Sequence, residues 1–251
     1  MTWSIVARDR TSGEYGVAVA SKFFAVGAVC PYLASGAGAL STQSLVNPLL
    51  GVRGLRLLQA RVPAAVMVEA LIRADEGRAV RQLHAVDRDG GTAAHTGEAC
   101  VGWAGHRTND DVSVAGNMLV GPAVVEETLR AFKAHPDRPL AERLLRALHA
   151  GDQAGGDKRG RQAAALVTVA GEPHRDLDIR VDDHADPIGE LARLYEVAHE
   201  RFMARRRFFP TEADPLGIHD FAQLDAAIEA RLAEKPRPDL AALRRPGGAG
   251  G

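Results

Sequence analysis

The second residue of the chain combines two groups that can act together in catalysis. Thr2 directly follows the initiator methionine in MTWSIVARD. Methionine is normally removed before a small residue, which would leave Thr2 with both a hydroxyl and a free α-amine. An α-amine has a pKa of about 7.7–8.0, so a useful fraction is neutral near pH 7 and can accept the hydroxyl proton. A threonine activated by its own amine is an established nucleophile, although threonine at position 2 is also common without any such role.

A strand that begins at this residue would hold the two groups in place. In TWSIVARD, Thr2, Ser4 and Val6 would point to one face of an extended chain, and the residues between them to the other face. Chain termini are usually loosely held. The early alternation therefore predicts an amino terminus fixed inside a sheet, which raises the odds of a catalytic role.

Two polar residues end the next predicted strand, YGVAVAS, which the turn RTSGE joins to the first strand as a hairpin. The hairpin would bring Ser21 and Lys22 beside Thr2, with Ser21 as a contact for substrate. A lysine there would favour the neutral amine, because like charges repel, and would stabilise an alkoxide. The alternative is a solvated lysine at a strand end. Asn117 in VAGNML is either an oxyanion donor in the same cleft or a strand-end turn residue.

The glycine-rich segment GDQAGGDKRGRQ carries the charged cluster of Asp157, Lys158 and Arg159. It is not a phosphate-binding loop, because Asp157 stands where a lysine is required and no serine or threonine follows Lys158. We assign Asp157 to catalysis, and Lys158 and Arg159 to substrate binding. The alternative is a set of structural ion pairs on a tight loop.

A second polar cluster, VDDHADP, contains Asp182, Asp183, His184 and Asp186. These side chains suggest a metal-dependent hydrolase, but a strand end followed by a helix cap explains them better, with Asp186 as the N-cap. We therefore expect neither a metal nor another cofactor. The segment RFMARRRFF lies at a predicted helix C-terminus, where cations are favoured. We interpret it as a solvated helix face, with an interface to a second subunit as the alternative.

Composition limits the possible partners. The 251 residues carry a net charge of −1, without the basic excess typical of nucleic-acid binding. No apolar run reaches the roughly 18 residues that cross a bilayer, and Arg8 and Asp9 interrupt any signal peptide. Cys30 and Cys100 follow no metal-ligand spacing. We expect a cytoplasmic homo-oligomer that acts on a small molecule and binds neither nucleic acid nor membrane.

The order of the predicted elements defines the fold. Hairpins alternate with helix pairs, whereas a parallel α/β fold would alternate single strands and helices. The pattern predicts an α+β protein with two antiparallel sheets packed face to face and helices outside. We expect this domain to span residues 1–209, including a C-terminal helix over 187–207. Residues 210–251 would add a helical appendage and a tail rich in Pro, Gly and Arg that we predict to be disordered. The ranges expected to be strands are 2–9, 15–21, 28–35, 38–44, 81–87, 91–97, 111–119, 163–169 and 176–182, and the other helices are expected over 48–60, 63–74, 122–135 and 139–151.

Four segments, in this order, resemble a bacterial family of unknown function: TWSIVARD, GVAVASKFFAVGA, GGDKRGRQAA and DLDIRVDDH. The resemblance runs from Thr2 to roughly His199. That family is assigned to the N-terminal nucleophile (Ntn) hydrolases, which implies a four-layer αββα sandwich. By likeness to the proteasome subunits of that superfamily, Thr2 is the nucleophile once Met1 is removed. By the same likeness, Asp157 corresponds to an aspartate of a superfamily loop that stands three residues before a serine. In this chain Gly160 stands in the place of that serine.

Other departures from the superfamily argue against peptidase activity. In the superfamily the end of the second strand normally carries an aspartate, whereas this chain has Ser21 and Lys22 there. The superfamily lysine usually comes later, from the third strand, so Lys22 is a candidate substitute for that lysine. Two functions remain. One is an amidohydrolase acting on a C–N bond of a small amide, cyclic amide or ureido compound. The other is a catalytically inactive protein that keeps the sandwich and binds a metabolite or a protein partner.

Overall fold

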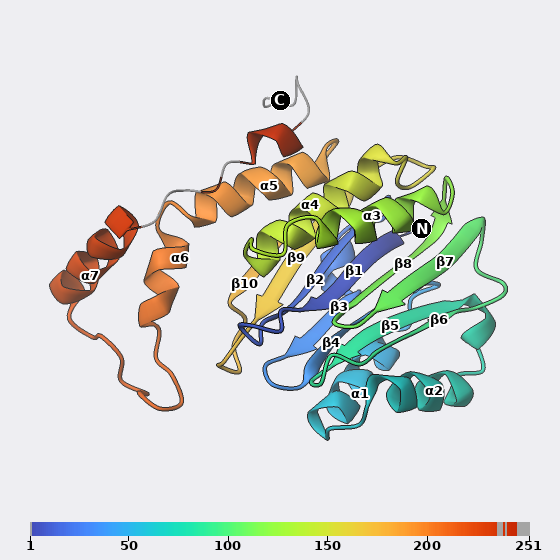
Figure 1. Ribbon diagram of the computed structural model, residues 1–251, viewed down its shortest axis with the longest axis horizontal. Coiled ribbons are helices and arrows are strands. Elements are labelled where there is room, and N and C mark those ends of the chain that lie inside the picture. The colour runs from blue at the N-terminus through green and yellow to red at the C-terminus, as the bar shows by residue number, and fades with distance from the viewer. Residues whose placement is uncertain (1, 235–237, 239, 245–251) are drawn as a thin grey trace.

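Ten strands form two antiparallel sheets that pack face to face in the computed structural model, which describes residues 2–234, 238 and 240–244 (Figure 1). The larger sheet has the order β10-β9-β2-β1-β8-β7, and the smaller sheet has the order β3-β4-β5-β6. The strands of the larger sheet are β1 (Thr2–Arg8), β2 (Tyr15–Ser21), β7 (Trp103–Asn109), β8 (Val112–Leu119), β9 (Ala163–Val169) and β10 (Leu177–Val181). Those of the smaller sheet are β3 (Pro31–Ala34), β4 (Gly38–Ser44), β5 (Arg81–Asp87) and β6 (Thr92–Thr96).

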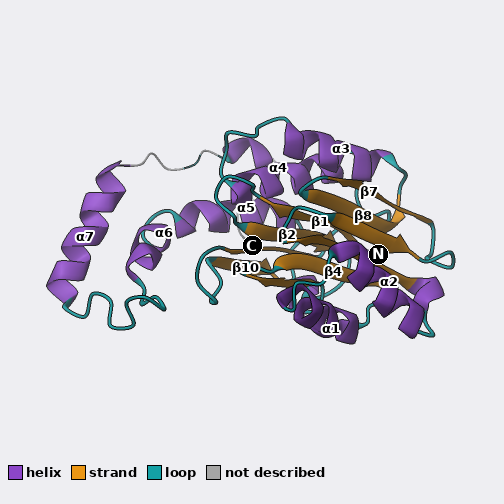
Figure 2. Cartoon of the chain, turned by 60° about the horizontal axis from the view of Figure 1, so that its bottom comes forward, coloured by secondary structure: helices purple, strands orange, loops and turns teal. Residues whose placement is uncertain are grey.

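Helices cover the outer face of each sheet, which completes the predicted αββα sandwich (Figure 2). The smaller sheet is covered by α1 (Pro48–Gln59) and α2 (Ala64–Ala74). The larger sheet is covered by α3 (Ala123–Lys133), α4 (Leu140–Gln153) and α5 (Pro187–Ala198). The predicted fold class is therefore confirmed.

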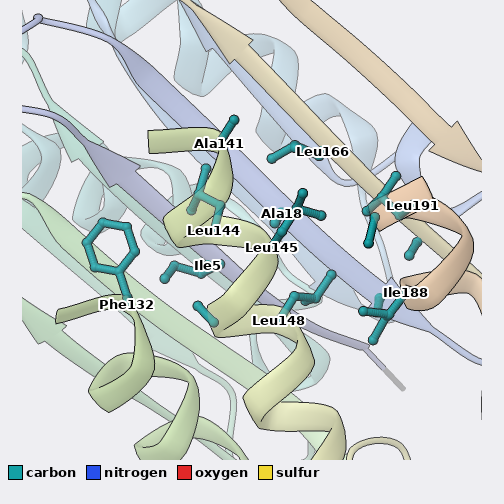
Figure 3. Packing of buried hydrophobic residues seen from close by; sticks show 14 of the residues in the cluster. Ile5, Ala18, Phe132, Ala141, Leu144, Leu145, Leu148, Leu166, Ile188 and Leu191 are labelled. Carbon is teal, nitrogen blue, oxygen red and sulfur yellow. The ribbon is translucent and has the colours of Figure 1, made fainter. Parts of the chain in front are cut away.

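The alternation of the first strand is also confirmed. Trp3 and Ile5 of β1 are buried against the helices of the larger sheet, in the core drawn in Figure 3. Val6, on the opposite face of β1, packs between the two sheets. Because β1 pairs with both β2 and β8, it lies in the interior of the sheet and its backbone is hydrogen-bonded on both edges.

The predicted helix over 187–207 is interrupted. It begins as expected, with Asp186 accepting a hydrogen bond from the Gly189 amide at 3.3 Å, but α5 ends at Ala198. His199 Nδ1 then bonds the carbonyl of Tyr195 at 2.9 Å, and Arg201 has a non-helical φ of −153°. A separate short helix, α6 (Phe202–Arg205), follows the break.

The C-terminal segment extends away from the sandwich and partly returns to it (Figure 1). Arg201 forms ion pairs with Asp225 and Glu229 of α7 (Phe221–Glu234), both at 2.7 Å. Further on, Leu240 and Leu243 are buried with the core that includes α5. These two residues belong to the tail that we predicted to be disordered; the remainder of that tail lies largely outside the described residues.

Candidate functional site

The register of the larger sheet places polar residues from three neighbouring strands together. Thr2, the first residue of β1, lies opposite Ser21 of β2 on one side and opposite Asn117 of β8 on the other. Thr2 is only 6% exposed, and its hydroxyl donates a hydrogen bond to Ser21 Oγ at 3.1 Å. The predicted hairpin therefore does bring Ser21 beside the predicted nucleophile.

Asn117 holds the backbone of the same residue. Its side-chain Nδ2 donates to the carbonyl oxygen of Thr2 at 3.3 Å and to Gln82 Oε1 at 3.0 Å. Since an amide nitrogen has two hydrogens, these two acceptors use both of them. In this arrangement Asn117 anchors Thr2 to the smaller sheet, and its role as an oxyanion donor stays a prediction.

Asp157 fastens the glycine-rich loop to the same end of the sheet. Its carboxylate is buried and accepts hydrogen bonds from the backbone amides of Lys22, at 2.8 Å, and Arg159, at 2.7 Å. The Arg159 guanidinium pairs with it at 3.3 Å, and a β-bridge joins Asp157 to Leu119 at the end of β8. The ion pair between Arg159 and Asp157 therefore holds the loop in place, and it lies next to the candidate site.

The two lysines of the site project from its edge. Lys22 and Lys158 are exposed, and neither forms an ion pair with a carboxylate of the described residues. Lys158 Nζ lies beside Gly102, 3.4 Å from where a Cβ on that glycine would stand. All seven residues that we assigned to catalysis or substrate binding from sequence thus lie at one end of the sandwich.

A network of buried polar side chains continues from the site into the space between the sheets, and the sequence analysis missed it. Ser4 Oγ lies 2.7 Å from His84 Nε2, and His84 Nδ1 lies 3.0 Å from Ser113 Oγ. Ser4 also donates to Gln43 Oε1 at 2.7 Å, and Gln43 donates to Gln82 at 2.8 Å. Because Gln82 also accepts from Asn117, the network reaches from the core to the carbonyl of Thr2.

Burial controls the charge of the histidine in this network. His84 is fully buried, and desolvation lowers its pKa to about 3, with a further contribution from the neighbouring His106. A charged imidazolium would lose its hydration between the sheets, which disfavours the protonated form. His84 is consequently neutral at physiological pH.

Asp157 allows a direct test of how this end of the sandwich is held together. We expect Asp157→Asn to destabilise the protein by about 2–3 kcal/mol, because the buried carboxylate accepts from two backbone amides and a guanidinium, and a hydrogen bond to a charged group contributes about 1.5–3 kcal/mol. Urea unfolding at pH 7 measures the change. The matched control is Asp183→Asn, an exposed carboxylate at the same end of the sheet that accepts one side-chain bond from Gln162. Equal stabilities of the two variants would contradict the structural role of Asp157.

The alternative metal cluster is occupied by other interactions. Asp182 pairs with Arg180 at 3.5 Å, Asp183 accepts from Gln162 at 3.2 Å, and Asp186 caps α5. Across the described part of the chain, no group of three or more His, Cys, Asp or Glu side chains is arranged to hold a metal ion. In the same residues, no helix is both long enough and apolar enough to cross a membrane.

Two face-to-face antiparallel sheets under helical layers, with the first strand at the centre of the larger sheet, define the protein as an α+β sandwich. The model of the family described as "Family of unknown function (DUF1028)" matches residues 2–191. The chain belongs to this family.

One solved structure agrees with this assignment. Protein SPO2555 from Silicibacter pomeroyi, described under the same family model, is 31% identical with a TM-score of 0.80, over 87% of this chain and 99% of that one. The ancestral beta-subunit Anbu from Yersinia bercovieri aligns over 81% of this chain and 97% of its own, at 13% identity. Its TM-score of 0.34 is too low to establish a common fold. A search of curated proteins finds no match to this chain.

Proposed function

We propose that the protein is an amidohydrolase of the Ntn-hydrolase type, which uses an N-terminal Thr2 to cleave a C–N bond in a small amide, cyclic amide or ureido compound. The observation that supports this most is the placement of Thr2. A hydroxyl at the extreme end of a chain is fixed by pairing to two strands, by a bond to Ser21 and by the Asn117 amide. Such positioning is costly for a chain end and useful for a nucleophile.

The proposed reaction has two stages. The Thr2 Oγ attacks the substrate carbonyl while the α-amine of Thr2 takes the hydroxyl proton, and the amine then passes this proton to the leaving nitrogen as the C–N bond breaks. The acyl group is left as an ester on Thr2. Water, deprotonated by the same amine, releases the acid and restores the hydroxyl. Backbone amides at the strand ends, or Asn117 after a rearrangement, would donate to the oxyanion.

The surface around Thr2 also suggests the character of the substrate. Large apolar side chains that are at least half exposed flank the strands at this edge, namely Phe23 and Phe24 after β2, Leu45 after β4, Val120 after β8 and Val101 before β7. Exposed apolar groups gathered around a polar centre are typical of ligand-binding surfaces. We therefore expect substrates with an apolar group next to the scissile amide.

The charge of Lys22 provides a test of the mechanism. Replacing Lys22 by Met should raise the pKa of the Thr2 amine, because a neighbouring cation no longer opposes its protonation. The acid limb of the pH–rate profile should then move to higher pH, and turnover at pH 7 should fall, while the unfolding midpoint stays the same. Lys133→Met, an exposed lysine at the end of α3, is the matched control. An unchanged profile would show that Lys22 is a solvated lysine at a strand end, and Asp157 or Lys158 on the glycine-rich loop would be the next candidates.

Two measurements test the proposal as a whole. Intact-mass analysis of the purified protein should show the loss of one methionine, since only a free Thr2 amine can serve as the base. A panel of amides and ureido compounds should then contain at least one that the wild-type protein hydrolyses and that Thr2→Ala does not. A fully retained Met1 in a protein that hydrolyses none of the panel would favour the catalytically inactive alternative.

A further inference from the structure

A pocket of about 260 Å³ lies at the opposite end of the larger sheet from Thr2. Its floor includes Glu14, which precedes β2, and Thr168, near the end of β9. Tyr195 and His199 from the end of α5, together with residues of α6 and α7, close it from the other side. Figure 1 shows this separation, with α6 and α7 at the left of the molecule and the N mark at the right.

Tyr195 contributes a buried phenol ring and its hydroxyl to the lining of this pocket. The residue is only 1% exposed, and its side chain lines the pocket. The charges that act on the phenol include those of Glu14 and Arg206, and both residues line the pocket. A phenol hydroxyl in the lining of a pocket can donate a hydrogen bond to a bound carboxylate.

His199 offers a second polar position. Its Nδ1 donates to the Tyr195 carbonyl at 2.9 Å, which leaves Nε2 as an acceptor with no partner in the described residues. The ring stacks edge-on against Tyr195, with centroids 4.5 Å apart. The orientation of the imidazole is therefore fixed from two directions, as in built binding sites.

The cations of the pocket differ in how they are neutralised. Arg206 pairs with Asp176, and Arg231 of α7 pairs with Glu234 at 2.9 Å. Arg207 also lines the pocket, but no carboxylate of the described residues pairs with it. The Arg207 guanidinium is thus available for an anion. Because Glu14 lies on the floor of the pocket, a ligand with one negative charge is favoured over a ligand with two.

We propose that this pocket binds a small organic monocarboxylate, with the carboxylate held by Arg207 and the Tyr195 hydroxyl and an apolar body lying against Met203 and Leu232. The lining supports both parts, because Met203, Ala204 and Leu232 add apolar surface next to the polar groups. Arginine binds carboxylates through parallel N–H donors, which suits a single planar anion. The volume is close to the lower end of the range of about 300–1,000 Å³ that is usual for ligand sites.

The site is independent of the proposed amide hydrolysis. Tyr195, His199 and the residues of α6 and α7 all lie beyond residues 2–191, which the family model matches. The pocket therefore needs the C-terminal segment of this chain in addition to Glu14 and Thr168, which lie in the part that the family model matches. Its ligand would be a regulator or a second substrate recognised away from Thr2.

Calorimetric titration of the full chain tests the proposal, with hexanoate and phenylacetate as probes. Each carboxylate should bind saturably at a single site, and the neutral probes hexanamide and phenylacetamide should bind at least tenfold more weakly. Tyr195→Phe and Arg207→Gln should each weaken carboxylate binding about tenfold or more, since each removes a hydrogen bond to a charged group. Arg205→Gln, an exposed neighbour on α6, and Thr2→Ala should leave binding unchanged.

The outcomes separate clearly. No saturable binding of either carboxylate would overturn the proposal, as would binding that survives both Tyr195→Phe and Arg207→Gln. Tighter binding of hexyl phosphate than of hexanoate would overturn the preference for a monocarboxylate. Tyr195→Phe keeps the ring that packs against His199, and an unchanged unfolding midpoint would show that a loss of binding does not come from a loss of fold.

Discussion

Replacing Thr2 by alanine is expected to lower the hydrolysis of any amide substrate by at least about 10³-fold, because loss of the nucleophile removes the covalent route entirely. The α-amine of the chain remains, but it has no hydroxyl proton to accept. Thr2→Ser keeps the hydroxyl and should retain most of the turnover. The measurement is the initial rate of amine or ammonia release from the best compound of the amide panel.

Stability separates chemistry from folding in this experiment. The lost side chain donates one hydrogen bond to Ser21, so Thr2→Ala should cost only about 1 kcal/mol of unfolding free energy. Thr11→Ala, in the exposed β1–β2 turn, is the control for an ordinary threonine. If Thr2→Ala hydrolyses the substrate at the wild-type rate, the N-terminal nucleophile is excluded and the activity belongs elsewhere.

The second large effect concerns His84 and the pH dependence of stability. Its pKa is about 3 in the folded protein, against an ordinary value of about 6.5, so below pH 6.5 the unfolded chain binds a proton that the folded protein does not. The stabilisation is fully present above pH 6.5 and is lost as the pH falls towards 3, by about 1.4 kcal/mol per pH unit. Between pH 6.5 and 4.5 this single group should remove about 2 kcal/mol.

His84→Gln tests this assignment. The variant cannot take up the proton, so its unfolding free energy should fall less steeply with pH than that of the wild type over this interval. It should also be less stable at pH 7, by about 1–3 kcal/mol, because Ser4 or Ser113 loses a partner. Urea denaturation at several pH values gives both quantities, and His135→Gln, which is exposed, supplies the reference slope. Parallel slopes for wild type and His84→Gln would disprove the role of His84.

The sequence predicted the strands and their pairing where the local residue pattern agrees with the overall fold. The alternation in TWSIVARD predicted both the strand and the face on which Thr2 lies, and the turn residues predicted the hairpin that pairs it with Ser21. The strand β7 was missed for a physical reason. WAGHRTN shows no apolar alternation, because β7 is an edge strand whose only hydrogen-bonded neighbour in the sheet is β8.

The polar network was beyond sequence reasoning for a different reason. In RQLHAVD, the polar residues Gln82 and His84 alternate with Leu83 and Ala85, which is the usual pattern of a strand with one solvated face. Here the apolar face meets α2, and the polar face meets the larger sheet instead of water. Alternation identifies two faces of a strand, but it does not say what covers each of them.

The break after α5 shows a similar limit. Amphipathic periodicity continues through Phe202 and Met203, and no proline or glycine marks an end at His199. At the break Arg201 leaves the helical conformation and pairs with Asp225 and Glu229 on α7, which are distant in sequence, so the local pattern does not encode these contacts. Residues of α6 and α7, which follow that turn, help to line the pocket beside α5, and so the pocket was not predictable from the pattern.

The space between the sheets is divided into two halves of opposite chemistry. Near Thr2 it is filled by hydrogen-bonded side chains such as Gln43 and His84, and farther along it is filled by apolar residues such as Val17 and Val86. The apolar half can accept volume-conserving exchanges one at a time. In the polar half, a change at one residue leaves its partners unpaired, so that substitutions there must come in sets. Single substitutions that alter stability are therefore tolerated better in the apolar half than in the polar half beside Thr2. A new substrate specificity would arise more easily from the exposed apolar residues around Thr2 than from the buried polar residues beneath it.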